Sequence, residues 1–173
     1  RLILDIVRRH EPIARAMITA HTNLTQQSVH RLVETLKAGG LLRAGAPLRG
    51  TRRGQPSPTI ELVKEAAHSI GVSVNTDAIT LSLADFGCNI IAQQTLEMVP
   101  SDRRVMLAAL SQTLQSLLKE HAVSRDRLIG LGFAMSGFFV SDNRAFNAPE
   151  PLRDWSLIDL RPELEEVFEL PVW

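Results

Sequence analysis

Apolar residues recur at helical spacing in the first forty residues and predict three helices. Pro12 ends the first helix near His10, and the second is expected from Ile13 to Thr22. Thr25 is a side-chain N-cap for the third, which Gly39-Gly40 ends. The apolar set of the first helix is Leu2, Ile3, Ile6 and Val7. The set expected to face inward on the third is Val29, Leu32, Val33 and Leu36.

The outward face of the third predicted helix is polar near its N-terminal end. Gln suits adenine and Arg suits guanine in the major groove, while hydroxyl groups reach phosphates. The same face also fits an ordinary three-helix bundle whose polar side is solvated, so the helix alone leaves both interpretations open. The candidate DNA contacts on this helix are Thr25, Gln26, Gln27, Ser28, His30 and Arg31.

Two short apolar runs follow, with a basic segment rich in Gly and Pro between them. Residues 41–43 and 59–62 predict the two strands of a hairpin, or wing, around this tip. Arginines in such a tip lie along phosphates or enter a narrow minor groove. A charged linker is the alternative, but the apolar runs on both sides favour a hairpin. The candidate DNA contacts in the tip are Arg49, Arg52, Arg53 and Gln55.

The second part of the chain has the pattern of an α/β domain of order βββαβ. Strands are predicted over residues 68–74, 78–85, 89–96 and 128–134, because each is an apolar or alternating run bounded by turn residues. A helix is expected to start at Ser101-Asp102 and to lie on the sheet. Its inward stripe is Leu107, Leu110, Leu114, Leu117 and His121.

Charge divides the chain at the same place as the hydrophobic pattern. Residues 1–64 contain 11 Lys and Arg against 4 Asp and Glu, whereas residues 65–173 contain 8 against 15, so that a total of zero conceals a net of +7 and −7. A basic module suits a polyanion, although chance clustering of solvated charge gives the same count. We therefore expect two domains, 1–64 and 65–173.

Several functional classes are excluded by composition. The single cysteine, Cys88, forms no internal disulfide and is expected to be packed in a strand. One Cys and five scattered His do not supply the roughly four ligands of a zinc site, so no metal is expected here. No apolar run approaches the ~18 residues of a membrane span, and no signal peptide precedes the first helix. We expect a cytoplasmic protein without contact to a membrane.

Six segments of the chain contain recognisable motifs, namely residues 13–33, 39–42, 53–56, 70–74, 129–134 and 147–155. Together these motifs resemble the ROK family, which groups repressors, unassigned reading frames and sugar kinases. The resemblance implies an N-terminal all-α winged helix-turn-helix with a β wing, followed by an α/β actin-like (ribonuclease-H-like) lobe. It covers nearly the whole chain.

The resemblance also implies what this chain lacks and where a ligand binds. In the family, Pro171-Val172 belongs to the strand before the catalytic aspartate, and the zinc-binding cysteines come later. We therefore expect a fragment without the second lobe, and no cofactor in this segment. Gly137 and Asn147 are the candidate sugar contacts. The alternative, that these two are merely loop residues that cap the sheet, explains them equally well. Trp155 is expected to anchor its loop in the core.

The leading hypothesis is a sequence-specific DNA-binding transcriptional regulator. It is a repressor of carbohydrate-utilisation genes, with a sugar-responsive ROK domain, and binds double-stranded DNA as a homodimer. The alternative is an ATP-dependent ROK sugar kinase with an accessory N-terminal module. The stretch matching the first phosphate loop disfavours a kinase, because Ser73 replaces its acid and no glycine occurs from Val72 to Phe86. No catalytic residue is assigned. A third hypothesis makes the N-terminal bundle a protein-interaction module.

Overall fold

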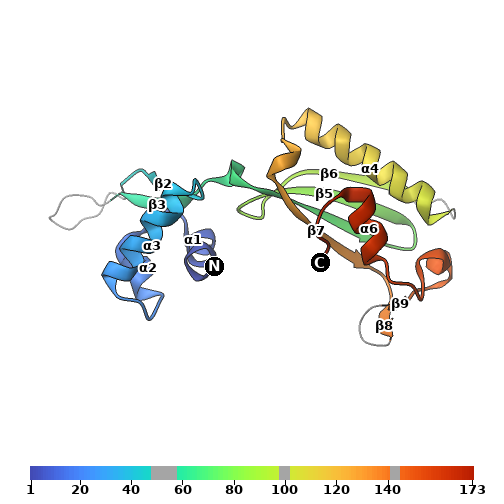
Figure 1. The fold of residues 1–173 in the computed structure, drawn as a ribbon, viewed down its shortest axis with the longest axis horizontal. Coiled ribbons are helices and arrows are strands. Elements are labelled where there is room, and N and C mark those ends of the chain that lie inside the picture. The colour runs from blue at the N-terminus through green and yellow to red at the C-terminus, as the bar shows by residue number, and fades with distance from the viewer. Residues whose placement is uncertain (48–57, 98–101, 141–144) are drawn as a thin grey trace. The chain divides into compact units, whose positions relative to one another are not determined.

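The computed structural model describes residues 1–47, 58–97, 102–140 and 145–173 (Figure 1). Contacts between residues divide the chain into two compact units, Arg1–Ala66 and Ala67–Trp173. We call them unit 1 and unit 2. Within the described ranges, no helix is both long enough and apolar enough to cross a membrane.

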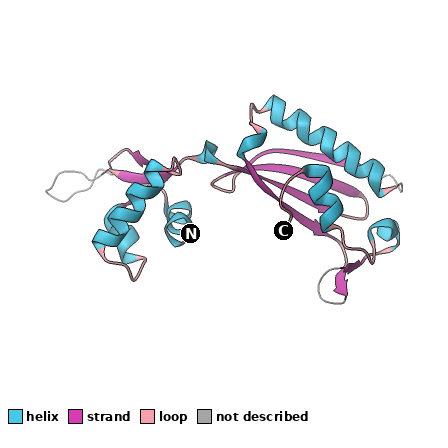
Figure 2. Ribbon diagram, in the orientation of Figure 1, coloured by secondary structure: helices cyan, strands magenta, loops and turns pink. Residues whose placement is uncertain are grey.

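Unit 1 combines three helices with a small antiparallel sheet (Figure 2). The sheet has the order β1-β3-β2, so β3 lies in the middle and pairs with both neighbours. Its elements in chain order are α1 Leu2–His10, β1 Ile13–Ala14, α2 Arg15–Ala20, α3 Gln26–Ala38, β2 Leu42–Gly45 and β3 Thr59–Leu62.

The ends of α1 and α3 are fixed by specific side chains. The Ser28 amide donates to Thr25 Oγ1 at 3.2 Å, which confirms Thr25 as the N-cap of α3. Gly40, at φ +71°, follows the last turn, where glycine has no Cβ penalty. Glu11 follows α1 and accepts a hydrogen bond from the Leu62 amide at 2.7 Å, which ties that helix end to β3.

The core of unit 1 corrects two predictions. Ile13 and Ala14 form a strand against β3 rather than the start of a helix, because Ile13 pairs with Ile60 at the free edge of the hairpin. Leu32 is 38% exposed and Leu36 only half-buried, since the buried stripe of α3 is narrow and is formed by Val29 and Val33. The buried apolar residues are Ile3, Ile6, Val7, Ile13, Ile18, Val29, Val33, Leu42, Ile60 and Leu62.

Unit 2 is built on a four-stranded mixed sheet of order β6-β5-β4-β7. β4 and β7 are parallel, and the other pairs are antiparallel. Val172 adds a parallel bridge to Leu131 on β7, as the strand expected at Pro171-Val172 requires. The order β4, β5, β6, α4, β7 is the predicted βββαβ order. The bounds are β4 His68–Val74, β5 Ala78–Asp85, β6 Ile90–Glu97, α4 Arg103–Glu120 and β7 Leu128–Met135.

Two helices contribute to one core with this sheet (Figure 1). Alternate residues of β4 and β5 are buried, and α4 adds a stripe of leucines to the same cluster. Trp155 is 1% exposed, which confirms its expected place in the core. Arg103 links α4 to the C-terminal helix through Glu163, with Nε and Oε2 at 2.8 Å. The C-terminal elements are β8 Phe138–Val140, β9 Ala145–Asn147, the 3-10 helix η3 Glu150–Trp155 and α6 Arg161–Phe168.

Three further expectations about unit 2 are corrected. Cys88 is exposed in the turn between β5 and β6 at φ +66°, rather than packed in a strand. His121 is the exposed C-cap of α4, because the helix ends at Glu120 before its stripe reaches that position. The third strand begins at Ile90, since Asn89 is used to close the turn on Asp85 through its amide and side chain.

Candidate functional site

The start of α3 presents most of its predicted polar face to solvent. Gln26, Gln27, His30 and Arg31 are exposed, and Ser28 is half-buried. Thr25 is exposed too, but its hydroxyl is engaged locally because it donates to Ser28 Oγ at 3.0 Å as well as capping the helix. The structure therefore brings the six sequence-predicted residues together on one helical surface, with Thr25 serving the helix itself.

A cluster of charged side chains joins α2 to this surface. Arg15, at the start of α2, donates from Nη1 to His30 Nδ1 and from Nη2 to Glu34 Oε1, both at 2.6 Å. Lys37 Nζ donates to both Glu34 oxygens, at 3.3 and 3.1 Å. Sequence spacing could not reveal this cluster, because Arg15 and His30 lie on different helices.

The charge of Glu34 is favoured by its neighbours. The hydrogen bond from Lys37 lowers the pKa of Glu34, and the charges of Lys37 and Arg15 act in the same direction, against a desolvation that raises it. The Glu34 side chain is 43% exposed, so solvent screens these interactions. The carboxylate is the acceptor that holds the Arg15 guanidinium beside α3.

The hairpin predicted after α3 is present, and its tip lies outside the described residues. β2 and β3 pair from Leu42 with Leu62 to Gly45 with Thr59. Arg43 on β2 is paired with Glu61 on β3, with Nε and Oε2 at 3.3 Å. The candidate contacts that fall in the tip, outside the described part of the chain, are Arg49, Arg52, Arg53 and Gln55.

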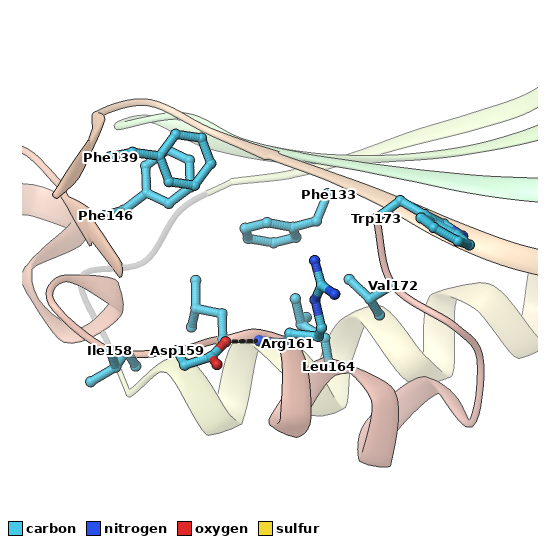
Figure 3. A pocket seen from close by; sticks show the side chains of 10 residues that line it. Phe133, Phe139, Phe146, Ile158, Asp159, Arg161, Leu164, Val172 and Trp173 are labelled. Carbon is cyan, nitrogen blue, oxygen red and sulfur yellow. Dashed lines mark hydrogen bonds between the residues drawn. The ribbon is translucent and has the colours of Figure 1, made fainter. Parts of the chain in front are cut away.

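Unit 2 contains a cavity of about 480 Å³, which we call the aromatic pocket (Figure 3). Its Phe139 and Phe146 come from β8 and β9 and lie 4.0 Å apart between ring centroids. The Arg161 side chain extends from the start of α6 and lines the pocket (Figure 3). Its backbone amide donates to Asp159 Oδ1 at 3.1 Å. The lining residues are Phe133, Phe139, Phe146, Ile158, Asp159, Leu160, Arg161, Leu164, Val172 and Trp173.

The two predicted sugar contacts pack against each other beside this pocket. Gly137 follows β7 at φ +148°, and a Cβ there would lie 2.7 Å from the Asn147 carbonyl oxygen. Asn147 is exposed at the end of β9, where it pairs with Phe138. The room that Gly137 leaves is filled by the backbone of Asn147. Sequence reasoning did not single out the pocket residues. The signal that could have found them is the concentration of phenylalanine, since four of the chain's six lie within residues 133–146 and three of these line the pocket.

We expect Gly137→Ala to destabilise unit 2 by about 1–3 kcal/mol, because an L residue is strained at this φ and its Cβ meets backbone. A urea titration of the free energy of unfolding measures the loss. Gly132→Ala is the control, since its Cβ would meet nothing closer than the Ile70 carbonyl oxygen at 3.8 Å. Equal stabilities of the two variants would contradict the backbone contact.

The turn matching the kinase phosphate loop is closed by protein groups. The Asn75 amide donates to the Ala78 carbonyl at 2.9 Å, and Ser136 Oγ donates to Asn75 Oδ1 at 3.0 Å. Side chains with a Cβ occupy every position of this turn, where a phosphate loop needs close backbone approach. Among the described residues, no three His, Cys, Asp or Glu side chains are placed to hold a metal ion.

Comparison with known proteins extends over both units. The chain is 25% identical to the xylose repressor of Bacillus subtilis (strain 168), over 100% of this chain and 44% of that protein. It is 26% identical to a transcriptional regulator of Mycobacterium tuberculosis (strain ATCC 25618 / H37Rv), over 98% of this chain and 38% of the regulator. The chain thus spans less than half the length of these relatives. No family model matches it.

A solved structure shows the same fold. A ROK family transcriptional regulator, described as a homologue of the E. coli MLC protein, superposes with a TM-score of 0.66 at 17% identity, covering 98% of this chain and 43% of that one. Both units lie within the region of similarity. The resemblance to ROK-family transcriptional regulators is therefore confirmed along the whole of this chain.

Proposed function

We propose that this chain is the DNA-binding part, and the beginning of the sugar-responsive domain, of a transcriptional repressor. The observation that carries the proposal is the extent of similarity to the xylose repressor, which includes unit 1 as well as unit 2. A sugar kinase has no need of a basic N-terminal unit with an exposed polar helix. Unit 1 has that character, since residues 1–64 have 11 Lys and Arg against 4 Asp and Glu.

In this proposal unit 1 acts as a winged helix-turn-helix. α2 and α3 are the two helices, and α3 is the recognition helix that enters the major groove with its N-terminal residues. Gln26, Gln27, His30 and Arg31 read base edges, while Ser28 and the cap residue lie near phosphates. The β2–β3 hairpin is the wing, and its arginines contact the DNA backbone or minor groove. A homodimer on double-stranded DNA places two such helices on two half-sites.

The effector of unit 2 is proposed to be a sugar or a sugar derivative. The aromatic pocket has the composition of a small-molecule site, mostly apolar with a few polar groups. Its phenylalanines suit the apolar face of a sugar ring, and Asp159 and Arg161 suit hydroxyl or acidic substituents. Asn147 ends β9 and Gly137 immediately precedes β8, the two strands that carry Phe146 and Phe139. D-xylose is the first sugar to test, given the name of the Bacillus relative.

Capture of genomic DNA fragments tests the proposed function. The 173-residue chain is mixed with sheared genomic DNA of its source, and the bound fragments are sequenced with and without D-xylose or other pentoses and hexoses. We expect enrichment of a few sites beside carbohydrate-utilisation genes, and lower enrichment with one sugar. Capture without preference for any site would contradict a sequence-specific regulator.

The recognition helix is tested by Gln27→Ala. We expect this variant to remain folded and to lose about 1–3 kcal/mol of preference for particular base pairs, because one base contact is lost while phosphate contacts stay. Competition between selected and random DNA measures the preference. Gln115→Ala, the same change at an exposed position of α4, is the control. If Gln27→Ala, His30→Ala and Arg31→Ala all kept the wild-type preference for selected over random DNA, α3 would not recognise bases.

The proposal includes no enzymatic activity. We expect no ADP formation from ATP in the presence of glucose, xylose or N-acetylmannosamine, because Ser73 replaces the acid of the phosphate loop and residues 73–77 contain no glycine to approach a nucleotide phosphate. A coupled assay with a ROK glucokinase as positive control measures it. Sugar-dependent ADP formation by this chain would favour the kinase alternative.

A further inference from the structure

The contact between Arg15 and His30 places a constraint on the histidine ring. Arg15 Nη1 lies 2.6 Å from His30 Nδ1. A guanidinium group has five N–H donors and no acceptor, so it is the donor in this bond. His30 Nδ1 must therefore carry a lone pair. In a neutral imidazole only one nitrogen carries hydrogen, and here that nitrogen is Nε2.

Arg15 is itself firmly held. Its Nη2 donates to Glu34 Oε1 at 2.6 Å, and its Nε is buried without a hydrogen-bond partner among the described residues. Lys37 also holds Glu34 by donating to both of its carboxylate oxygens. The guanidinium is thus anchored to α3 one helical turn from His30. The same Nη1 donor therefore stays on His30 Nδ1.

We propose that Arg15 is a positioning residue for base recognition, which holds His30 in the Nε2–H tautomer so that His30 meets DNA as a hydrogen-bond donor. The inference rests on the proposed function, because it assigns His30 to the DNA surface of α3. Arg15 itself lies at the start of α2 and acts through His30.

The fixed tautomer determines which base edges His30 accepts. Guanine presents two acceptors in the major groove, O6 and N7, whereas cytosine presents the N4 amino donor. An Nε2–H donor fits the guanine edge and opposes the cytosine amino group. A histidine free to exchange tautomers accommodates either partner. Arg15 therefore gives His30 a preference for guanine over cytosine at one position of the site.

Long-range proton–nitrogen NMR of the free chain tests the tautomer directly. Spectra are recorded at a pH above which the histidine signals no longer change, and the signal missing in His30→Gln identifies His30. We expect only the Nε2–H form in the wild-type chain, and a detectable Nδ1–H population in Arg15→Ala. An Nδ1–H form in the wild type, or identical populations in both chains, would overturn the proposal.

Binding to DNA tests the consequence. The probe is a duplex selected by the wild-type chain from a random pool, together with its single base-pair variants. We expect Arg15→Ala and His30→Ala each to lower the preference at the same base pair roughly tenfold, and the double variant to lower it no further. Arg104→Ala, which removes the same charge from an exposed position of α4, keeps the preference. Independent, multiplying effects of Arg15 and His30 would contradict the coupling.

A folded alternative to Arg15→Ala keeps the test decisive. Arg15→Lys retains the charge and the long stem, but one ammonium group cannot reach both Glu34 and His30 in the same geometry. It should release the tautomer as Arg15→Ala does. A wild-type chain that prefers no DNA sequence would refute the proposed function, whereas an unaltered His30 tautomer in both Arg15 variants refutes this inference alone.

Discussion

The affinity of this chain for DNA should fall by roughly a thousandfold between about 50 and 200 mM salt. Such a loss corresponds to about six phosphate contacts, each of which releases condensed counterions when a cationic side chain approaches. Unit 1 has enough cations for this number, since residues 1–64 contain 11 Lys and Arg. Five of these cations are paired with carboxylates, so the contacts come from the other six. The paired cations are Arg1, Arg15, Lys37, Arg43 and Lys64.

A fluorescence titration at several salt concentrations measures the slope. Arg31→Ala should reduce the slope by about one contact, because Arg31 is exposed on α3 and has no ion pair among the described residues. Arg104→Ala removes the same charge from unit 2 and should leave the slope unchanged. Affinity that persists to about 0.3 M salt would show that the charge asymmetry of the chain has been misinterpreted.

The second large effect is expected from Ile18→Ala. Ile18 on α2 is fully buried, and removing such a side chain costs about 2–5 kcal/mol through lost burial and the cavity left behind. A unit of 66 residues is stabilised by only about 3–10 kcal/mol. Unit 1 should therefore lose about half of its free energy of unfolding, and binding to specific and random DNA should weaken together.

Leu32→Ala is the matched control for this variant. Leu32 is an apolar residue of the neighbouring helix, but its side chain is 38% exposed, so we expect a loss below about 1 kcal/mol and preserved DNA binding. Thermal melts of both variants, read with circular dichroism, compare the two costs. A Leu32→Ala variant that melts with Ile18→Ala would mean that Leu32 is covered by a partner, such as a second copy of the chain.

Much of the fold of unit 2 could be predicted because its local signals agree with one another. The strands at 68–74 and 78–85 alternate between buried and half-exposed positions. The strand at 128–134 comes after α4 and pairs in parallel with the strand at 68–74. Asp102 caps α4 through the Arg104 amide at 2.8 Å, as its position before the leucine stripe indicates. The pattern, the cap and the turn residues require the same arrangement.

The errors have a common physical origin in contacts between distant residues. Ile13 and Ala14 read as helix, but they complete a sheet with β3, whose residues lie more than forty positions later. Leu32 stays exposed because the other elements of unit 1 cover only Val29 and Val33 on α3. Neither the pairing of Ile13 and Ala14 with β3 nor the exposure of Leu32 leaves a periodic signal in the local sequence.

The candidate site shows the same division. The polar face of α3 follows from helical spacing, so its residues could be named from the sequence. The Arg15–His30 pair and the aromatic pocket are made by residues of separate elements, which only the tertiary structure brings together. Gly137 was singled out for a ligand, and its backbone contact with Asn147 gives it a structural reason as well.

The most direct test of a sequence-specific DNA-binding unit is the ratio of two dissociation constants at one salt concentration. The first is for the duplex that the chain selects from a random pool, and the second is for random DNA of equal length. Recognition through α3 predicts a ratio of about a thousand or more in favour of the selected duplex, which collapses in a Gln27→Ala, His30→Ala, Arg31→Ala triple variant. Equal dissociation constants for the two duplexes would contradict the account.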